Sequence, residues 1–486
     1  MPLSDKSFLV LFYKKEHLTK AFFFEKKKQK TFVCLVTAAV LSGCAVGPNF
    51  KVPAPPVSVT SAPTAQKIPD QWWSQFGSAA IDSAINQALT NSPDLASQQA
   101  ALRAAQEQYR ATSGSLYPQI SGSLNASRSA TTLGPEALME SVGSTQIAAS
   151  YTLDLWGGTR RNIEEQAANV DQARYVLAES RLTLTASIAQ TLISIASLND
   201  QIGATNQIIA TEQQSRAQIS QQLALGSKTR ADLLQQDAQI AQTRTQLPPL
   251  AQQLDQAHHQ LAALSGAEAL AAPPQTLTLD DLHLPEDLPA AISSRFIAQR
   301  PDIEQQQALL HARTAAVGVA TANMLPSLIL SASDGTMNQK INGLVQNGIN
   351  IWSLGAGLTQ PLFEGGTLRA LRAEARAQLD QQAATYQQTV LNALSNVASS
   401  LTAIDHDRDA VTAASAYAAA AQSSLAFTRE QYQIGATDFT TLLTQQQAYQ
   451  QATLARITAI ATQYQDAVGL FQSLGGGWSD QPGATP

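Results

Sequence analysis

Four segments of the chain alternate between apolar and polar residues, the pattern of a β-strand with one apolar and one polar face. Two of them follow each other between positions 119 and 155, and two more between positions 327 and 359. Their apolar members are Ile120, Leu124 and Ala126, then Ile147, Ala149, Tyr151, Leu153 and Leu155, then Leu328, Leu330 and Ala332, and finally Trp352, Leu354, Ala356 and Leu358. A polar, glycine-containing loop separates the strands of each pair, so the sequence predicts two pairs of amphipathic strands.

A very long helix is predicted after each pair of strands, at roughly 159–224 and 367–433. Neither stretch contains a proline, and apolar residues recur at steps of three and four, which is coiled-coil spacing. The recurring residues are Leu184, Ile188, Leu192, Ile195, Leu198 and Ile202 in the first stretch, and Leu368, Leu371, Ala375, Leu379, Ala383, Tyr386, Val390, Leu394, Val397 and Leu401 in the second. At about 1.5 Å per residue, each helix would be about 100 Å long.

Glycine turns predict that the chain reverses after each long helix, into shorter helices at about 229–264 and 437–474. Pro248 and Pro249 must break or offset the first of these, because proline lacks the backbone donor and its ring clashes with the preceding turn. The glycine run that begins at Gly475 follows a helix rather than a strand, so it reads as a helix stop and not as a phosphate-binding loop.

The two halves of the chain repeat each other at an offset of 208 residues (302 minus 94). The matching pairs are Ser92-Pro93-Asp94 with Arg300-Pro301-Asp302, Pro118 with Pro326, Gly157-Gly158-Thr159 with Gly365-Gly366-Thr367, and, at an offset of 209, Leu225-Gly226-Ser227 with Ile434-Gly435-Ala436 and Leu233-Leu234 with Leu442-Leu443. This period is too long for a solenoid. We therefore expect a two-fold tandem repeat, each copy opening with a helix at its Pro-Asp pair, 93–113 and 301–323, where proline in the first turn is tolerated.

Four amphipathic strands cannot form a membrane wall by themselves. Each unpaired backbone group at an open sheet edge costs several kcal/mol in hydrocarbon, and the smallest closed membrane barrels have eight strands. Several copies of the chain could close a shared barrel, with polar faces toward a wet lumen and apolar faces toward lipid. A soluble sandwich shows the same alternation, so the strands alone leave both structures open.

The N-terminal segment has the order of a secretory signal, with a basic run at 25–30, an apolar run at 32–41 and small residues before Cys44. The apolar run is too short to span a bilayer as a helix, which takes roughly 20 residues. Leu41-Ser42-Gly43-Cys44 resembles a bacterial lipobox, which implies that Cys44 is acylated and that Ala45 after it favours the outer membrane. The proline-rich segment 45–67 predicts an extended tether.

Composition and charge argue against several function classes. The formal charge is −6, and residues 1–43 carry eight Lys and three acidic residues, so the mature chain has −11 (−6 minus 5), which disfavours nucleic acid as a partner. Both cysteines, Cys34 and Cys44, lie near the N-terminus, which excludes a disulfide framework in the mature chain. His258-His259 and Asp405-His406-Asp407 lack a third ligand at metal-binding spacing. We find no Walker, Rossmann or Gly-x-Ser-x-Gly motif, so we expect neither an enzyme nor a cofactor.

Together these features resemble the outer membrane factor family, the TolC-like channels, and within it the NodT-type lipoproteins of RND multidrug efflux. The resemblance extends from Cys44 to about Trp478. It is carried by Leu41-Ser42-Gly43-Cys44, Gly47-Pro48-Asn49, Trp72-Trp73, Phe76-Gly77, the two Pro-Asp helix starts, Pro118, Pro326 and Gln360-Pro361-Leu362-Phe363 before Gly365-Gly366. It implies an α+β membrane protein: a homotrimer with a shared twelve-stranded β-barrel, four strands from each chain, and a long antiparallel α-helical barrel in the periplasm.

The resemblance also implies partners and a gate. The partners are two further copies, outer-membrane lipid, a periplasmic membrane-fusion adaptor and an inner-membrane RND pump. The adaptor would meet the helical tips, Leu225-Gly226-Ser227 and Ile434-Gly435-Ala436. Relatives close the tip with acidic side chains, but the matching positions here are Thr441 and Thr444, and Gln447 stands where relatives can carry Arg. The charged substitutes nearby are Asp438, Arg230, Asp232 and Asp237, and the alternative is that these are solvated helix-end charges.

We therefore expect a passive, gated outer-membrane duct of a tripartite RND-type efflux system that exports drugs or other small molecules. The alternatives are a TolC-like channel for type I protein secretion and a lipid-anchored periplasmic coiled-coil scaffold. The expected division of the chain is a signal peptide with an atypical N-terminal extension at 1–43, a lipidated tether and anchoring segment at 44–78, two repeats at 79–270 and 271–478, and a flexible tail at 479–486.

Overall fold

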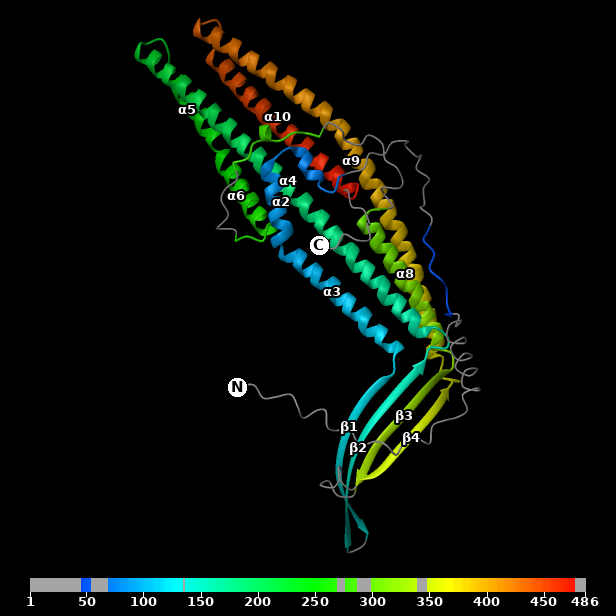
Figure 1. Ribbon diagram of the computed structural model, residues 1–486. Helices are drawn as coiled ribbons and strands as arrows, with labels where there is room; N and C mark the ends of the chain where they lie inside the picture. Colours follow the sequence, from blue (N-terminus) through cyan, green and yellow to red (C-terminus); the bar gives the residue numbers. More distant parts are fainter. Residues whose placement is uncertain are drawn as a thin grey trace. The chain divides into compact units, whose positions relative to one another are not determined.

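The computed structural model describes residues 45–53, 69–133, 136–268, 276–285, 299–338 and 348–476. They belong to two compact units, one built around a β-sheet and one built of helices (Figure 1). The sheet unit comprises the segment up to Pro48, Gly114–Asn162 and Ala315–Glu374, and the helical unit comprises Asn49–Ser113, Ile163–Thr314 and the chain from Ala375 on.

The sheet has four antiparallel strands in the order β1-β2-β3-β4 (Figure 1). The strands are β1 (Gln119–Leu133), β2 (Glu136–Leu153), β3 (Ser327–Asn338) and β4 (Ile349–Thr359). One row across the sheet is Ile120, Ala149, Ala332 and Leu354, each opposite the next. Directly opposite residues of antiparallel strands share a face, so the register places the apolar positions of all four strands on one face, as the alternation predicted.

The first strand pair is longer than the sequence pattern predicted. We expected a polar loop between two short strands, but β1 pairs with β2 without interruption as far as Leu133 opposite Glu136. Backbone hydrogen bonds hold the rest of this ladder, and polar Ser and Thr residues make them as well as apolar residues do. The ladder therefore continues beyond the last position of the apolar alternation. The predicted C-terminal end of the second strand was also wrong: β2 ends at Leu153, so Leu155 lies outside the strand. The loop between β3 and β4 lies outside the described residues.

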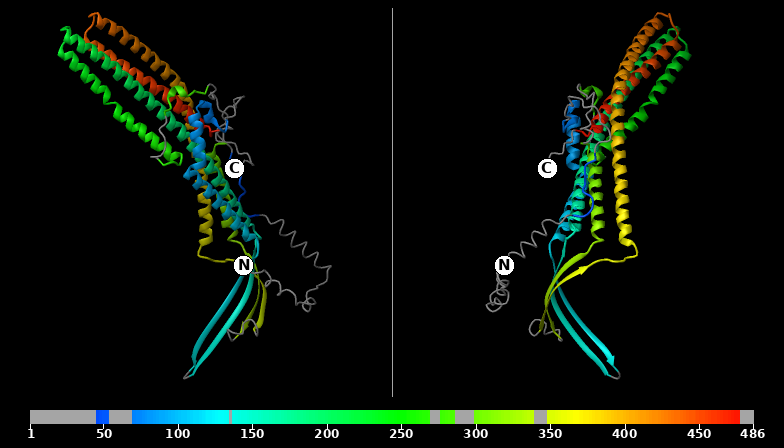
Figure 2. Two further views of the ribbon diagram at one scale, coloured as in Figure 1. Left: turned by 60° about the vertical axis from the view of Figure 1, so that its left-hand side comes forward. Right: turned by 90° about the vertical axis from the view of Figure 1, so that its right-hand side faces the viewer.

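The helices match the predicted stretches closely. They are α2 (Ala79–Asn91), α3 (Pro93–Ser113), α4 (Gly158–Ala224), α5 (Arg230–Arg244), α6 (Leu247–Leu264), α8 (Pro301–Ala322), α9 (Thr367–Gln433) and α10 (Phe439–Ser473), with 3-10 turns at Trp72–Phe76, Gly114–Leu116 and Leu279–Asp281. The long helices α4 and α9 have 67 residues each. As predicted, the helix that follows the first glycine turn is broken just before Pro248, into α5 and α6, whereas its counterpart α10 is continuous. Figure 2 shows α4 running beside α5 and α9 beside α10.

The main core of the helical unit forms around one apolar stretch of α4. The predicted stripe from Leu184 to Leu198 is buried there, together with residues of α2 and α10. This helix contains a window apolar enough to cross a membrane, but 72 % of that window is buried inside the chain, which identifies it as core. The stripe of α9 is only partly covered: Tyr386 and Val390 are buried, whereas Leu371 is exposed.

The segment at Trp72–Phe76 is anchored in this core by its aromatic rings. Trp72 is 1 % exposed, and its ring stacks on Phe471 of α10 at 5.3 Å between centroids. Phe76 packs edge-on against the same Phe471 ring at 6.3 Å. The burial confirms that the Trp72-Trp73 pair fastens the N-terminal part of the chain to the helices.

Replacing Trp72 with alanine is expected to lower the free energy of unfolding by about 3–5 kcal/mol, because the change leaves a cavity under the α10 rings. The measurement is denaturant unfolding of the detergent-solubilised protein followed by circular dichroism. Tyr109→Ala, which truncates an exposed aromatic ring on α3, is the control and is expected to change little. A Trp72→Ala protein as stable as the Tyr109→Ala protein would contradict the anchoring role.

Candidate functional site

One face of the sheet exposes large apolar side chains. Ile120 of β1 and Trp352 and Leu354 of β4 are 75 %, 72 % and 79 % exposed. The opposite face carries polar contacts, such as the hydrogen bond of 2.8 Å between the Ser333 and Ser353 hydroxyls. Within the described residues β1 pairs only with β2 and β4 only with β3, so each outer strand has an open edge. An exposed apolar face bounded by two open edges is unsuitable for water and suited to lipid and to further strands.

The residues after Cys44 are held against the junction between β2 and α4. The Val46 amide donates to the Trp156 carbonyl at 2.9 Å, and the Arg161 Nε donates to the Val46 carbonyl at 3.3 Å. Gly157 has φ +73°, and a Cβ there would lie 2.6 Å from the Ala45 Cα. Asp154 closes the junction by accepting the Thr159 and Arg160 amides of α4 at 3.0 Å each.

A second fixed point of this segment lies in the helical unit. The Phe50 ring stacks on the His311 ring of α8 with centroids 4.5 Å apart. The His311 Nε2 lies 2.9 Å from a Glu164 carboxylate oxygen on α4. Residues 45–53 are extended, as predicted, but they are not a loose tether, because both halves of the segment are packed. Cys44 itself and residues 54–68 lie outside the described residues.

The two predicted tips have the same turn. Gly226 and Gly435 adopt φ +77° and +79°, and the amides of Ser227 and Ala436 close the ends of α4 and α9 by donating to carbonyls five residues back, at 2.9 Å and 2.8 Å. This is the glycine-dependent Schellman closure of a helix end. The large side chains before these glycines, Leu225 and Ile434, are 83 % and 76 % exposed.

The charged candidates near the tips are mostly occupied in helix capping and pairing. The Asp438 carboxylate accepts the Thr441 amide at 2.7 Å and caps α10, and this bond lowers the pKa of Asp438. Asp232 forms a capping box with Thr229 at the start of α5. Asp237 pairs with Arg216 of α4, which holds the pKa of Asp237 below its usual range. Arg230 is exposed at the start of α5, and within the described residues its side chain has no hydrogen bond or ion pair.

The predicted gate position on α10 is hydrogen-bonded through neutral amides to the other helical hairpin, which is formed by α4 and α5. The Gln447 Nε2 donates to the Gln239 Oε1 of α5 at 2.7 Å. One turn further along, the Gln450 Nε2 donates to the Gln246 Oε1 at 2.9 Å. Thr441 and Thr444 are exposed on α10, and among the described residues no hydrogen bond joins either side chain to α5. Of these three predicted gate residues, Gln447 is the one whose side chain is hydrogen-bonded to the hairpin of α4 and α5.

Behind Gln239 lies a buried carboxyl group that the sequence analysis missed. Glu212 of α4 is 1 % exposed and accepts from the Thr243 hydroxyl at 3.0 Å and from the Gln239 Nε2 at 3.3 Å. Burial raises the pKa of Glu212, and the bonds from Thr243 and Gln239 offset part of this rise.

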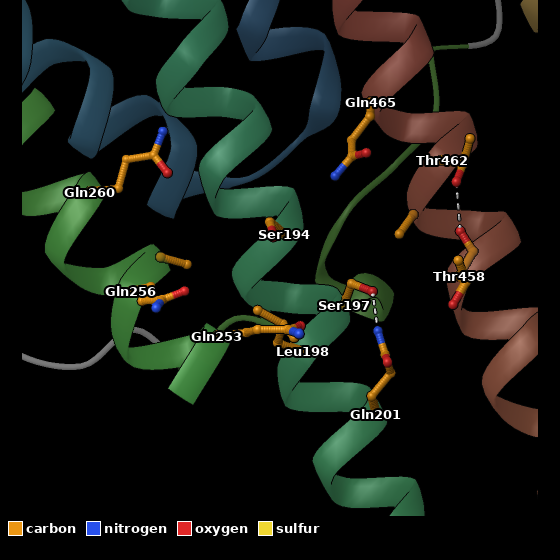
Figure 3. Close-up of a pocket in the computed structure, with 12 residues that line it drawn as sticks. Ser194, Ser197, Leu198, Gln201, Gln253, Gln256, Gln260, Thr458, Thr462 and Gln465 are labelled. Atoms are coloured by element: carbon orange, nitrogen blue, oxygen red, sulfur yellow. Dashed lines mark hydrogen bonds between the residues drawn. The ribbon is translucent and has the colours of Figure 1, made fainter. Parts of the chain in front are cut away.

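A groove of about 350 Å³ lies between α4, α6 and α10. Figure 3 shows its lining of amides and hydroxyls, with Gln201 bound to Ser197 at 3.0 Å and Thr462 donating to the Thr458 carbonyl at 3.0 Å. The lining contains no charged side chain. Such a groove can form hydrogen bonds but supplies neither a nucleophile with a base nor a counter-charge.

Asp407 on α9 lies against Asp466 of α10 and is 8 % exposed. Burial, followed by the neighbouring Asp466 carboxylate, raises the pKa of Asp407 to about 6, and His406 offsets a part of this. One oxygen of Asp407 is buried without a hydrogen-bond partner among the described residues. The two carboxylates therefore repel each other between α9 and α10, and protonation of one of them removes this repulsion.

Comparison with known proteins gives a consistent result. The profile of a family described as "Outer membrane efflux protein" matches the chain twice, at residues 84–267 and 292–476. The pyoverdine export outer membrane protein OpmQ of Pseudomonas putida is 31 % identical over 457 residues, which cover 88 % of this chain and 93 % of that protein. The cation efflux system protein CusC of Escherichia coli O157:H7 is 27 % identical over 454 residues, covering 91 % and 97 %.

Solved structures agree. A crystal structure of CusC matches with a TM-score of 0.82 at 26 % identity, covering 89 % of this chain and all (100 %) of that chain. The outer membrane channel CmeC of Campylobacter jejuni matches with a TM-score of 0.84, covering 90 % and 95 %, and at 23 % identity it supports the fold alone.

The Asp407–Asp466 contact predicts a pH-dependent stability. An acid whose pKa is raised in the folded chain binds its proton more tightly there, so the free energy of unfolding falls as the pH rises from about 4 to about 6. Asp407→Asn keeps the shape and removes the charge, so its melting temperature should exceed that of the wild type at about pH 7.5, and the two should converge below about pH 4. Asp405→Asn, an exposed neighbour, is the control. An equal difference at both pH values would show that the carboxyl pair is not responsible.

Proposed function

The chain belongs to the outer membrane efflux protein family, and we propose that three copies of it form the outer-membrane duct of a tripartite efflux system. The observation that carries the proposal is the four-stranded sheet, with one exposed apolar face and an open edge on β1 and on β4. The family consists of transport components without enzymatic activity. The duct itself is passive, and an inner-membrane pump of the RND type supplies the energy.

The open edges argue for the trimer. In hydrocarbon each unpaired backbone group costs several kcal/mol, and pairing β1 of one copy with β4 of the next removes both edges at once. Three copies then close a barrel of twelve strands, well above the minimum of eight. A periplasmic coiled-coil scaffold would leave the apolar face and both edges without a purpose, and nothing in the chain favours protein secretion over small-molecule efflux.

The N-terminus supports a lipid anchor at Cys44. Ala45 and Val46 are held at the β2–α4 junction, so an acylated Cys44 would leave the protein surface next to the strand ends. We assign 1–43 to a removed signal peptide, 44–78 to the anchoring segment, 79–270 and 271–478 to the two repeats, and 479–486 to a tail. Acyl chains at this position would hold the start of the barrel at the membrane surface.

The gate proposed here consists of amides rather than acids. Gln447 binds Gln239 across the two hairpins at 2.7 Å, and this neutral bond would hold the α9–α10 hairpin in its closed position. Asp232 and Asp438 cap helices, and Asp237 is paired with Arg216, so these three acids are better explained by local structure than by a gate. Arg230, Thr441 and Thr444 remain candidates for the rim of the opening.

The exposed tips are the proposed adaptor surface. Leu225-Gly226-Ser227 and Ile434-Gly435-Ala436 present two large aliphatic side chains on tight turns, which suits docking of a periplasmic membrane-fusion adaptor. For the cargo we propose small molecules, drugs among them. The related proteins are named for pyoverdine, cations and toluene, a range that commits this chain to no single substrate.

From this proposal we predict that the protein is found in the outer membrane as a particle of three mature chains. We expect the detergent-solubilised protein to have this mass and to incorporate labelled palmitate. Cys44→Ala should abolish the label while the trimer persists, because the barrel is held by strand pairing. A monomer, or a protein that fractionates with the inner membrane, would contradict the proposal, whereas an unlabelled trimer from the wild type would contradict only the anchor.

Removing the Gln447 amide is expected to open the duct. We predict that Gln447→Ala and Gln239→Ala each raise the single-channel conductance in planar bilayers several-fold, since either change deletes the bond between the hairpins. The matched control is Gln445→Ala on the same helix, whose bond to Ser424 stays within the α9–α10 hairpin. A Gln447→Ala channel with the conductance of the Gln445→Ala channel would exclude this bond as a gate.

A further inference from the structure

The starts of α3 and α8 are equivalent positions of the repeat, and they differ in one functional residue. Arg300 precedes the Pro301-Asp302 pair of α8, whereas Ser92 precedes Pro93-Asp94 of α3. The two copies therefore allow an internal comparison of the same site with and without an arginine.

In the second copy the arginine joins two elements. Arg300 is 8 % exposed, and its Nε and one terminal nitrogen donate to the two carboxylate oxygens of Asp302 at 3.0 Å and 2.8 Å. Its other terminal nitrogen donates to the Ser473 carbonyl at the end of α10. The guanidinium is thus bound bidentately by a carboxylate and lies at the negative end of a helix, and both interactions favour a cation.

The first copy keeps the framework around the missing guanidinium. The end of α6 takes the place of the end of α10, and the amides of Gly266 and Ala267 close it at 3.2 Å and 2.9 Å, as those of Gly475 and Gly476 close α10 at 3.0 Å and 2.9 Å. A Cβ on Gly266 would lie 2.4 Å from the Asn91 carbonyl oxygen, so this helix end is pressed against the α2–α3 junction. Figure 1 shows α6 ending beside that junction.

A cavity of about 480 Å³ occupies this position in the first copy. Its polar lining includes the carboxylates of Asp94 and Glu179 and the hydroxyls of Thr183 and Ser187, its apolar part includes Leu184 and Leu264, and it contains no Lys or Arg. Asp94, the counterpart of Asp302, has no ion pair among the described residues. The cavity therefore has the size of a ligand site and two carboxylates at the end of a helix.

Glu179 of α4 is the second carboxyl group in the lining of the cavity. Burial raises the pKa of Glu179, and repulsion from the Asp302 carboxylate raises it further. The positive charge of Arg300 offsets only part of this rise in pKa. A cation bound beside Glu179 would add to the offset that Arg300 provides.

We propose that this cavity binds the guanidinium group of a small cationic ligand, with Asp94 in the role that Asp302 has toward Arg300 and the end of α6 in the role of the end of α10. A guanidinium matches the carboxylate with two parallel hydrogen bonds, which a quaternary ammonium cannot form. The two carboxylates together favour a ligand that carries a second positive charge. This site is separate from the proposed barrel wall, tips and gate, and it does not depend on transport.

Agmatine, which carries a guanidinium and an amine, is the probe for the detergent-solubilised full-length protein. Isothermal titration should show saturable binding of one agmatine per chain, and tetramethylammonium at equal ionic strength should not bind. Asp94→Asn is expected to weaken agmatine binding at least about tenfold, because the bidentate bonds are lost. Glu107→Gln, which removes an exposed carboxylate on the same helix, should leave the affinity unchanged.

A second variant supplies the missing group from the chain itself. Ser92→Arg reproduces the sequence of the second copy, so we expect it to raise the melting temperature and to abolish agmatine binding. If this variant fails to fold, Asp94→Asn decides the question alone. Agmatine binding that survives in Asp94→Asn would overturn the proposal. Absence of saturable binding to the wild type would also overturn it, and dissociation of the particle by Asp94→Asn in that case would identify an arginine of a neighbouring copy as the occupant.

Discussion

The backbone groups along the outer edges of β1 and β4 need partners, and this requirement determines what the chain can be. Within the described residues neither edge is paired, and the sheet presents its apolar face openly. Water disfavours the face, and hydrocarbon disfavours the edges. The proposed closed ring of such sheets in a membrane satisfies both requirements, so association of the copies would complete the fold.

The duplication shows each local sequence signal twice, which explains why the sequence predicted so much of the structure. The long helices and their turns were found within a residue or two because proline-free periodic stretches end at Gly226 and Gly435, whose left-handed backbone other residues rarely adopt. The docking of residues 45–53 was not found, since nothing local in a proline-rich segment indicates that Gly157 leaves room for Ala45. The length of β1 and β2 was underestimated because backbone pairing continues where apolar alternation stops.

The polar contacts between helices were the least predictable part of the candidate site. Glu212, Gln239 and Gln447 lie on three helices and meet only after packing, and a pattern of apolar residues contains no information on such contacts. Polar groups inside coiled-coil interfaces fix the register of the helices at a cost in stability. The buried Glu212 and Asp407 fit this description, because each lies in an interface between long helices with repetitive apolar stripes.

The break between α5 and α6 has a consequence for symmetry. Three duplicated chains place six hairpins around one axis, and identical hairpins would give the ring a six-fold appearance. Every second hairpin, however, contains the interruption at Pro248, whereas the others continue through an unbroken α10. The ring is therefore only three-fold, with two kinds of ridge in alternation. Six identical subunits bound around this ring would meet two kinds of binding surface in alternation, so they could not all be bound in the same way.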